Sequence, residues 1–324
     1  MSSLAGYLRK LAERGIYAKE DIVSAYVSWL LEVKYMILCH QREQWVSNAG
    51  DYEYVAVKYA KRGNDVYLSR VEDRLRGLGV HVPNVDFDFE KKPYTNMLFI
   101  TLTYDTKLCS FDMAWKKIGA EFNLWRANIR KKYGEFSIFR CFEAFENGHP
   151  HIHIVIIFKE KRFRVFKSYE EGRDGKIREV WLIHEKEDFE PYWHSWTKIK
   201  AVYNLKGSLN YLKKYIMKCA EYKQEDNKGK ITLAMCWVFR KKAFYVSGQF
   251  RKALSDLISY LCTSKTRKVQ LNLLNQELKA NKWKVLGFIS AFLLNFDVEI
   301  WTFRLETEQI EKVFNEWEKT KHFV

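Results

Sequence analysis

The sequence predicts an α+β protein, with a central antiparallel sheet carrying helices and with helical regions on either side of it. Three observations support this prediction. Segments 97–105, 136–145 and 152–158 are rich in β-branched and aromatic residues, which is typical of strands. Between the first two segments, residues 111–133 place apolar side chains at the three- and four-residue spacing of a helix. The same helical spacing dominates the chain before and after this central part.

The first part of the chain is expected to be helical from Leu4 to about Leu78. Ile22, Tyr26 and Leu30 recur every four residues, which indicates the apolar stripe of an amphipathic helix. Residues 80–93 then contain two prolines, an asparagine and a run of charges. Such a composition ends regular structure and is typical of a domain boundary.

After the three β segments, a helix is expected from about Gly207 to Glu221 and a strand near 233–247. Helical spacing returns from about residue 253. The apolar run 285–296 would span about 18 Å as a helix, short of a ~30 Å hydrocarbon layer, so we expect a buried element and no membrane span. The expected domains are an N-terminal helical region at 1–92, the sheet domain at 93–252 and a mainly helical C-terminal region at 253–324.

Composition narrows the partner of the protein. The 324 residues carry a formal net charge of +15, which predicts an anionic partner, and 16% of them are aromatic. Basic and aromatic residues together suit single-stranded nucleic acid, whose phosphates attract lysine and arginine and whose bases stack on rings. None of the six cysteines forms a C-x-x-C pair, so no zinc ribbon is indicated, and reduced thiols in the cytoplasm are expected.

The stretch 142–158 contains a candidate metal site. If residues 151–158 form a strand, His151 and His153 project from the same face, about 6.6 Å apart along the strand. Asn147 and Gly148 supply turn chemistry, so antiparallel pairing with the preceding strand could bring Glu143 beside both histidines. Two imidazoles and one carboxylate leave positions open for water and substrate oxygens, as a catalytic metal requires.

Other interpretations of this stretch stay open at the level of sequence. Glu146 is a rival third ligand, although its place beside the Asn-Gly turn favours exposure to solvent. His149 has the same parity as the other two histidines, but Pro150 favours a position in the turn. The histidines could also be hydrogen-bonded core residues without a metal, since histidine is found both inside proteins and at their surface.

A second candidate is the stretch 207–218, which reads as one helix. Tyr211 and Tyr215 are four residues apart and therefore share a face, with Lys214 and Lys218 next to them. A phenol has a reference pKa near 10, so a nucleophilic tyrosine needs positive charge nearby to favour the phenolate. The alternative is an ordinary amphipathic helix with half-buried tyrosines and solvated lysines.

These residues resemble the HUH endonucleases, and among them the rolling-circle replication initiators of archaeal or bacterial plasmids and viruses. The resemblance covers about residues 98–247. The strand 99–103 is similar to the first motif of the family, and the second is matched by Glu143, Asn147-Gly148 and His151-Ile152-His153. Tyr211, Lys214 and Tyr215 match the third motif, Y-x-x-K-Y. Residues 240–247 are similar to a trailing strand of several archaeal and phage initiators.

The resemblance implies an HUH nuclease core, an antiparallel RRM-like sheet, within the 93–252 domain. Mg²⁺ or Mn²⁺ would be held by the histidines and Glu143 and would polarise the scissile phosphate of single-stranded DNA at a replication origin. Tyr211, or second Tyr215, would attack with the help of Lys214, leaving a 5′-phosphotyrosyl enzyme and a 3′-OH primer. No G-x-x-x-x-G-K-[ST] occurs, so a host or separately encoded helicase, besides a polymerase, is expected.

Two other functions remain open: a transposase or relaxase with the same chemistry, and a non-catalytic DNA-binding protein whose histidines are structural. Residues 159–178 carry a local excess of positive charge and two glycines, which predicts a hairpin or loop that either tracks phosphates or is merely solvated. Trp181, Trp193 and Trp196 are interpreted as core residues or as stacking platforms. The expected DNA-binding residues are Lys213, Lys218, Arg130, Lys131, Arg162 and Arg164.

Overall fold

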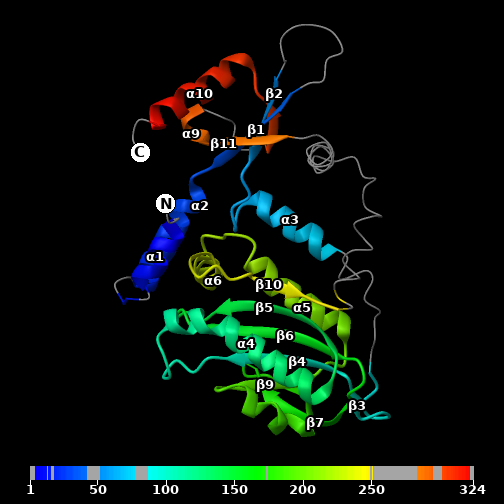
Figure 1. Ribbon diagram of the computed structural model, residues 1–324. Coiled ribbons are helices and arrows are strands. Elements are labelled where there is room, and N and C mark those ends of the chain that lie inside the picture. The colour runs from blue at the N-terminus through cyan, green and yellow to red at the C-terminus, as the bar shows by residue number, and fades with distance from the viewer. Residues whose placement is uncertain are drawn as a thin grey trace. The chain divides into compact units, whose positions relative to one another are not determined.

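The structure is a computed structural model that describes residues 4–12, 14–15, 18–41, 52–76, 87–172, 174–248, 250, 283–294 and 301–321. The chain forms two compact units. The first consists of Met1–Val27 and Arg62–Ser259, and the second of Ser28–Lys61 and Tyr260–Val324. The described residues have the α+β architecture that the sequence predicts, with antiparallel sheets (Figure 1). The boundaries of the sheet domain at 93–252 stay a prediction.

A five-stranded sheet forms the centre of the first unit. Its strand order is β10-β5-β6-β4-β9, and every neighbouring pair is antiparallel. The strands are β4 (Met97–Thr103), β5 (Phe136–Ala144), β6 (Pro150–Phe158), β9 (Thr197–Ala201) and β10 (Phe244–Val246). The three β segments of the sequence therefore become the three inner strands of this sheet.

The two faces of this sheet carry different helices (Figure 1). On one face lies α4 (Phe111–Tyr133), whose Trp115 contacts Phe142 of β5 with ring centroids 5.8 Å apart. On the other face, α5 (Leu205–Lys218) buries Leu209 and Leu212 in a core shared with Val155 of β6. Residues of odd number on β4, β5 and β6 face α5, because side chains alternate along a strand. α3 (Asp65–Arg76) packs into the same core.

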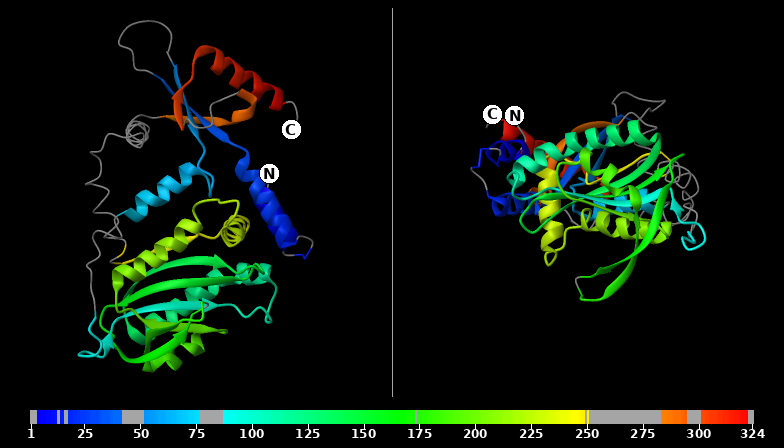
Figure 2. Two further views of the ribbon diagram at one scale, coloured as in Figure 1. Left: turned by 180° about the vertical axis from the view of Figure 1, so that it is seen from behind. Right: turned by 90° about the horizontal axis from the view of Figure 1, so that it is seen from below.

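Beyond the central sheet the first unit has a second sheet, of three strands in the order β3-β7-β8. The predicted hairpin after the histidine strand is present as β7 (Phe163–Glu171) and β8 (Ile177–Ile183), and it projects from the rest of its unit (Figure 2). β3 (Tyr94–Thr95) pairs with β7. Two short 3-10 helices, His184–Asp188 and Glu190–Tyr192, follow β8.

The expected strand near 233–247 is wrong over its first half. Helix α6 (Asn227–Val238) occupies this part of the chain, and only Phe244–Val246 is a strand. The Asp226 side chain accepts a hydrogen bond from the backbone N–H of Gly229 at 3.0 Å and so caps the helix. α6 is buried on nearly all sides, and a short apolar run without a polar face cannot be told from a strand by periodicity.

In the N-terminal region, the helical prediction holds for α1 (Leu4–Ala12), α2 (Lys19–Leu31) and α3. It is wrong for β1 (Lys34–Gln41) and β2 (Tyr52–Lys58), which form an antiparallel pair. These strands bury Tyr35 and Ile37 among residues from the far end of the chain. The partners that make them strands lie about 250 residues away, so local spacing could not identify them.

The second unit contains a four-stranded sheet in the order β11-β1-β2-β12, with β11 (Lys284–Ser290) and β12 (Thr302–Arg304). α9 (Ala291–Leu294) and α10 (Thr307–Lys321) complete its described elements. The apolar run 285–296 is therefore not uniformly buried, since Val285 is 55% exposed on β11. The helical spacing expected at 257–278 lies outside the described residues. No helix in the described ranges is long and apolar enough to cross a membrane.

Candidate active site

The histidine strand and its neighbour bring three potential ligands together on the face of the sheet that α5 covers. Glu143 of β5 lies directly opposite His151 of β6 in the antiparallel register. One carboxylate oxygen, Glu143 Oε2, is 2.8 Å from His151 Nε2 and 3.0 Å from His153 Nε2, and the two Nε2 atoms are 3.0 Å apart. Both histidines are buried, and the Glu143 side chain is 13% exposed.

The electrostatics of this triad follow from its burial. Burial lowers the pKa of His151 more than the neighbouring Glu143 raises it, which favours the neutral imidazole that can bind a metal. Burial alone would raise the pKa of Glu143, but hydrogen bonds from His151 and His153 outweigh this effect and hold the pKa well below its usual range. The triad therefore combines a carboxylate with neutral imidazole.

Thr101 of β4 orients the second histidine. Its hydroxyl oxygen lies 3.2 Å from Nδ1 of His153, to which the register of β4 and β6 pairs it directly. When Nδ1 donates its proton to this oxygen, Nε2 keeps a lone pair that points into the triad. Such outer hydrogen bonds fix the tautomer and the ring orientation of histidine ligands. No sequence pattern had singled out Thr101 for such a role.

The arrangement fits a divalent cation. In an octahedral site with ligands at about 2.1 Å, neighbouring ligand atoms are about 3.0 Å apart, close to the 2.8–3.0 Å separations in the triad. Glu143, His151 and His153 are the group that can hold a metal among the described residues. Three protein ligands on one side would leave positions for water or a phosphate oxygen.

Two other residues considered from the sequence lie outside the triad. His149 is in the turn, as its proline neighbour indicated, with Nε2 2.9 Å from the Cys109 carbonyl oxygen. Glu146 is exposed, and its carboxylate is 3.5 Å from the ammonium of Lys228. Neither of them belongs to the group that can hold a metal.

Helix α5 places both tyrosines at the triad. It begins where the Asn204 side chain accepts a hydrogen bond from the Gly207 N–H at 2.6 Å, and its buried leucines fix the helix on the sheet. The hydroxyl groups of Tyr211 and Tyr215 are 2.6 Å apart. The ring of Tyr215 lies over that of His153, with centroids 4.4 Å apart.

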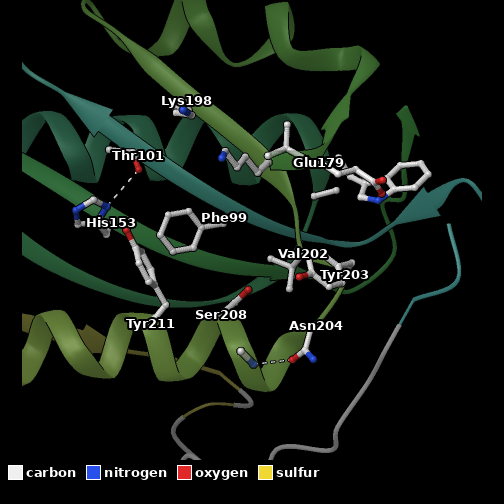
Figure 3. Close-up of a pocket in the computed structure, with 15 residues that line it drawn as sticks. Phe99, Thr101, His153, Glu179, Lys198, Val202, Tyr203, Asn204, Ser208 and Tyr211 are labelled. Carbon is white, nitrogen blue, oxygen red and sulfur yellow. Dashed lines mark hydrogen bonds between the residues drawn. The ribbon is translucent and has the colours of Figure 1, made fainter. Parts of the chain in front are cut away.

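The two tyrosines differ in their surroundings. Tyr211 is 47% exposed and points from α5 toward His153 (Figure 3). Tyr215 is half-buried, and burial, followed by the hydrogen bond with Tyr211, raises its pKa. Tyr215 therefore stays a neutral phenol over a wide pH range and can donate its proton to the Tyr211 oxygen.

The expected cations lie in different places. Lys214 is exposed on α5 and makes no hydrogen bond or ion pair within the described part of the chain, whereas the Lys218 ammonium lies 5.8 Å from the ring centre of Tyr215. Lys213 is half-buried on the same helix. The other candidates are remote from α5: Arg130 and Lys131 end α4 on the opposite face of the sheet, and exposed Arg162 and Arg164 belong to the start of the β7–β8 hairpin.

A cavity of about 480 Å³ opens beside the triad and contains residues that were not predicted from the sequence (Figure 3). His153 and Tyr211 form one end of it, and Lys198 and Lys200 of β9 line it as well. The alternation Lys198-Ile199-Lys200 was the available signal, because it places two cations on one face of a strand. Of the three tryptophans considered, Trp181 lines this cavity, Trp193 is buried, and Trp196 is 70% exposed.

Part of the chain is similar to a known family. A family model described as Replication-associated protein ORF2 matches residues 97–220, which is less than half of the 324 residues. The match begins at β4 and ends just after α5, so it contains the triad and both tyrosines. No match was found among curated proteins or among solved structures. The similarity supports a replication-associated protein that interacts with DNA.

Proposed function

We propose that this protein is an HUH endonuclease that initiates rolling-circle replication by nicking and rejoining single-stranded DNA at an origin. The observation that carries the proposal is the position of the Tyr211–Tyr215 hydroxyl pair beside the Glu143–His151–His153 triad. A nucleophile and a metal-binding set on facing elements of one fold supply the two components that cleavage of a phosphodiester requires. The similarity of residues 97–220 to a replication-associated family supports replication as the context.

Glu143, His151 and His153 would hold Mg²⁺ or Mn²⁺. When bound there, the metal supplies Lewis-acid polarisation of the scissile phosphate. The hydrogen bond between Thr101 and His153 keeps the second imidazole in the tautomer that can ligate. The partial burial of the triad strengthens these electrostatic interactions, because water competes less for the ligands.

Tyr211 is the first nucleophile in this proposal. Its oxygen forms a bond to phosphorus while the bond from phosphorus to the 3′-oxygen breaks, which gives a 5′-phosphotyrosyl link. The phenolic proton is balanced by the 3′-oxygen, which leaves as a 3′-OH. Tyr215 assists by donating its hydroxyl proton to the Tyr211 oxygen as negative charge develops there. Exposed Lys214 would approach the phosphate as a mobile positive charge.

The exposed position of Tyr211 in the cavity supports its role as the first nucleophile. Tyr215 carries the burdens of burial and a raised pKa, so it is the less reactive phenol in the arrangement described. It would act second, taking the strand in a later transfer step. Separation of the DNA strands and synthesis would be carried out by a separately encoded or host helicase and a polymerase.

The test is formation of a covalent adduct. Protein is mixed with Mn²⁺ and single-stranded oligonucleotides tiled across the replicon that encodes it, and products are separated on a denaturing gel. We expect an adduct with one tile, its loss with EDTA or in His153→Ala, and its strong reduction in Tyr211→Phe. Tyr222→Phe is the control for a tyrosine outside the site. Cleavage that survives Tyr211→Phe/Tyr215→Phe would contradict the tyrosine mechanism, and no adduct on any tile would favour a DNA-binding protein without catalysis.

A further inference from the structure

The cavity next to the triad extends the site along the sheet, in the direction away from the histidines. It shares His153 and Tyr211 with the site described above, and it continues past Phe99 to the first turn of α5 and to β8 (Figure 3). Its volume of about 480 Å³ lies in the range of small-ligand pockets. A molecule that reaches the tyrosine hydroxyl could therefore extend into this cavity.

The lining has the composition of a nucleotide site. Phe99, Trp181 and Tyr203 supply aromatic rings, and Tyr203 is 59% exposed. Asn204 and Ser208 add polar side chains at the start of α5. Aromatic rings stack on bases regardless of sequence, and cations nearby attract the phosphates of a single strand.

The cations of the cavity are held by one carboxylate. The ammonium groups of Lys198 and Lys200 are each 2.7 Å from the same oxygen, Oε2 of Glu170 on β7. Two positive charges thus share a single negative one. The other acidic residue of the lining, Glu179, is engaged separately, with its carboxylate 3.2 Å from the ammonium of Lys167.

We propose that Lys198 and Lys200 bind a backbone phosphate of the DNA strand next to the cleaved bond, and that Glu170 occupies the position of this phosphate when DNA is absent. The inference rests on the proposed function, because it assigns the cavity to the strand that Tyr211 cleaves. A phosphate offers at least two charged oxygens to the two lysines, whereas Glu170 offers both of them one oxygen atom. The phosphate therefore replaces the carboxylate without leaving either lysine unpaired.

Continuity with the triad favours a DNA strand over a free nucleotide as the occupant. The cavity meets His153 and Tyr211 at one end, so a strand lying in it passes the nucleophile. The Lys198 side chain is 59% exposed, so a chain longer than the cavity can enter from solvent. Glu170 makes entry selective, because only an anion that competes for both lysines displaces it.

The test measures binding in the absence of cleavage. The Tyr211→Phe/Tyr215→Phe protein in EDTA is titrated into a 5′-fluorescein-labelled 20-nucleotide oligothymidylate, and anisotropy is recorded at several KCl concentrations. We expect Lys198→Ala/Lys200→Ala to weaken binding about ten-fold and to reduce the slope of log K against log salt by about 0.7 for each phosphate that the protein no longer neutralises. Glu170→Gln should tighten binding by about three-fold.

Matched controls remove the same charges elsewhere in the same unit. Lys116→Ala/Lys117→Ala takes two lysines from α4 on the opposite face of the sheet, and Glu171→Gln changes the next residue of β7. Adding Glu170→Gln to the double lysine variant separates loss of the lysines from release of a negative charge. Circular dichroism establishes that each variant is folded. Changes no larger than those of the controls would overturn the inference.

Failure of the inference differs visibly from failure of the proposed function. If the wild-type protein forms its tile-specific adduct but binding ignores Lys198, Lys200 and Glu170, the cavity assignment is wrong and the nuclease proposal stands. If no adduct forms on any tile but the affinity follows these three residues as expected, the cavity binds single strands and the nuclease proposal fails.

Discussion

At the scale of single residues, the chemistry of the site depends on contacts that no single segment contains. His153 receives its orientation from Thr101 on another strand, and Glu143 stands opposite His151 because of the register of β5 and β6. Sequence spacing was sufficient to nominate the two histidines and the glutamate, since alternation and one turn place them on one face. It could not nominate Thr101, because the register of β4 with β6 is set by tertiary pairing.

The role of Thr101 can be tested by removing its hydroxyl group. Thr101→Val keeps the shape of the side chain but leaves Nδ1 of His153 without its partner, so we expect Mn²⁺ affinity to fall about ten-fold. Isothermal titration with MnCl₂ measures the change. Thr101→Ser should restore most of the affinity. Thr103→Val, two residues along the same strand, should have no effect, and an equal loss in both valine variants would contradict an orienting role.

At the scale of elements, two helix ends decide how the local structure is held. α5 starts at Asn204, whose side chain caps the helix that carries both tyrosines. α2 ends where the ammonium of Lys61 donates hydrogen bonds to the carbonyl oxygens of Trp29 and Glu32. A positive charge at a helix C-terminus satisfies carbonyl groups that have no partner in the helix and interacts favourably with the helix dipole.

Loss of the α5 cap should lower the stability of the first unit. Asn204→Ala removes the acceptor for the Gly207 N–H, and we expect a cost of about 1 kcal/mol in the free energy of unfolding. For a unit of this size, this corresponds to a fall of about 2–4 °C in melting temperature. Differential scanning calorimetry measures it, with Asn204→Asp as the variant that keeps a cap. Identical melting of the alanine and aspartate variants would mean that the cap contributes nothing.

Lys61 is expected to titrate far from an ordinary lysine. Its side chain is 1% exposed, and burial lowers its pKa to about 8, although the nearby charge of Glu32 partly opposes this. Between pH 8 and the unfolded pKa of about 10.4 the folded state holds fewer protons than the unfolded state, so the stability contribution of Lys61 rises with pH. NMR of ¹³Cε-labelled lysine should show one signal that titrates near pH 8.

Lys61→Met provides the assignment for this titration, because its spectrum should lack that signal while the other lysines are unchanged. A Lys61 signal that titrates above pH 10 would contradict the prediction. In that case the carbonyl partners and Glu32 would outweigh the cost of burial.

At the scale of the whole molecule, the chain passes between two compact units more than once. The first unit is made of Met1–Val27 and Arg62–Ser259, so residues 28–61 form an insertion into it. The two ends of this insertion are held close within the first unit, since the Tyr26 hydroxyl group donates a hydrogen bond to the Arg62 carbonyl oxygen at 2.6 Å. All residues of the triad, of the tyrosine pair and of the cavity belong to the first unit.

A chain that keeps only the first unit should therefore fold and bind metal. In it, a six-residue Gly-Ser linker joins Val27 to Arg62, and the chain ends at Ser259. We expect one cooperative thermal transition and a Mn²⁺ affinity within about three-fold of the full chain, because every residue of the site is retained. Calorimetry and MnCl₂ titration test this. A non-cooperative melt or absence of Mn²⁺ binding would show that the first unit depends on the second for its fold.

The elements that could be predicted from the sequence share one physical property. The α+β centre, the histidine strand, the hairpin after it and the tyrosine helix are each encoded by the spacing of neighbouring residues along about 10–25 positions. The strands β1 and β2 could not be predicted, since they are strands through pairing with β11 and β12 near the other end of the chain. α6 escaped prediction because burial on nearly all sides removes the periodic signal of a helix.

The sequence by itself thus determined the chemical groups of the site: two imidazoles and a carboxylate on one strand pair, and two phenols on one helical face. Only the tertiary structure decided what surrounds them. It brought Thr101 to His153, the Tyr215 ring onto His153, and Glu170 to Lys198 and Lys200. These contacts join residues that are between 28 and 62 positions apart on different elements, and local periodicity carries no information about pairing over such distances.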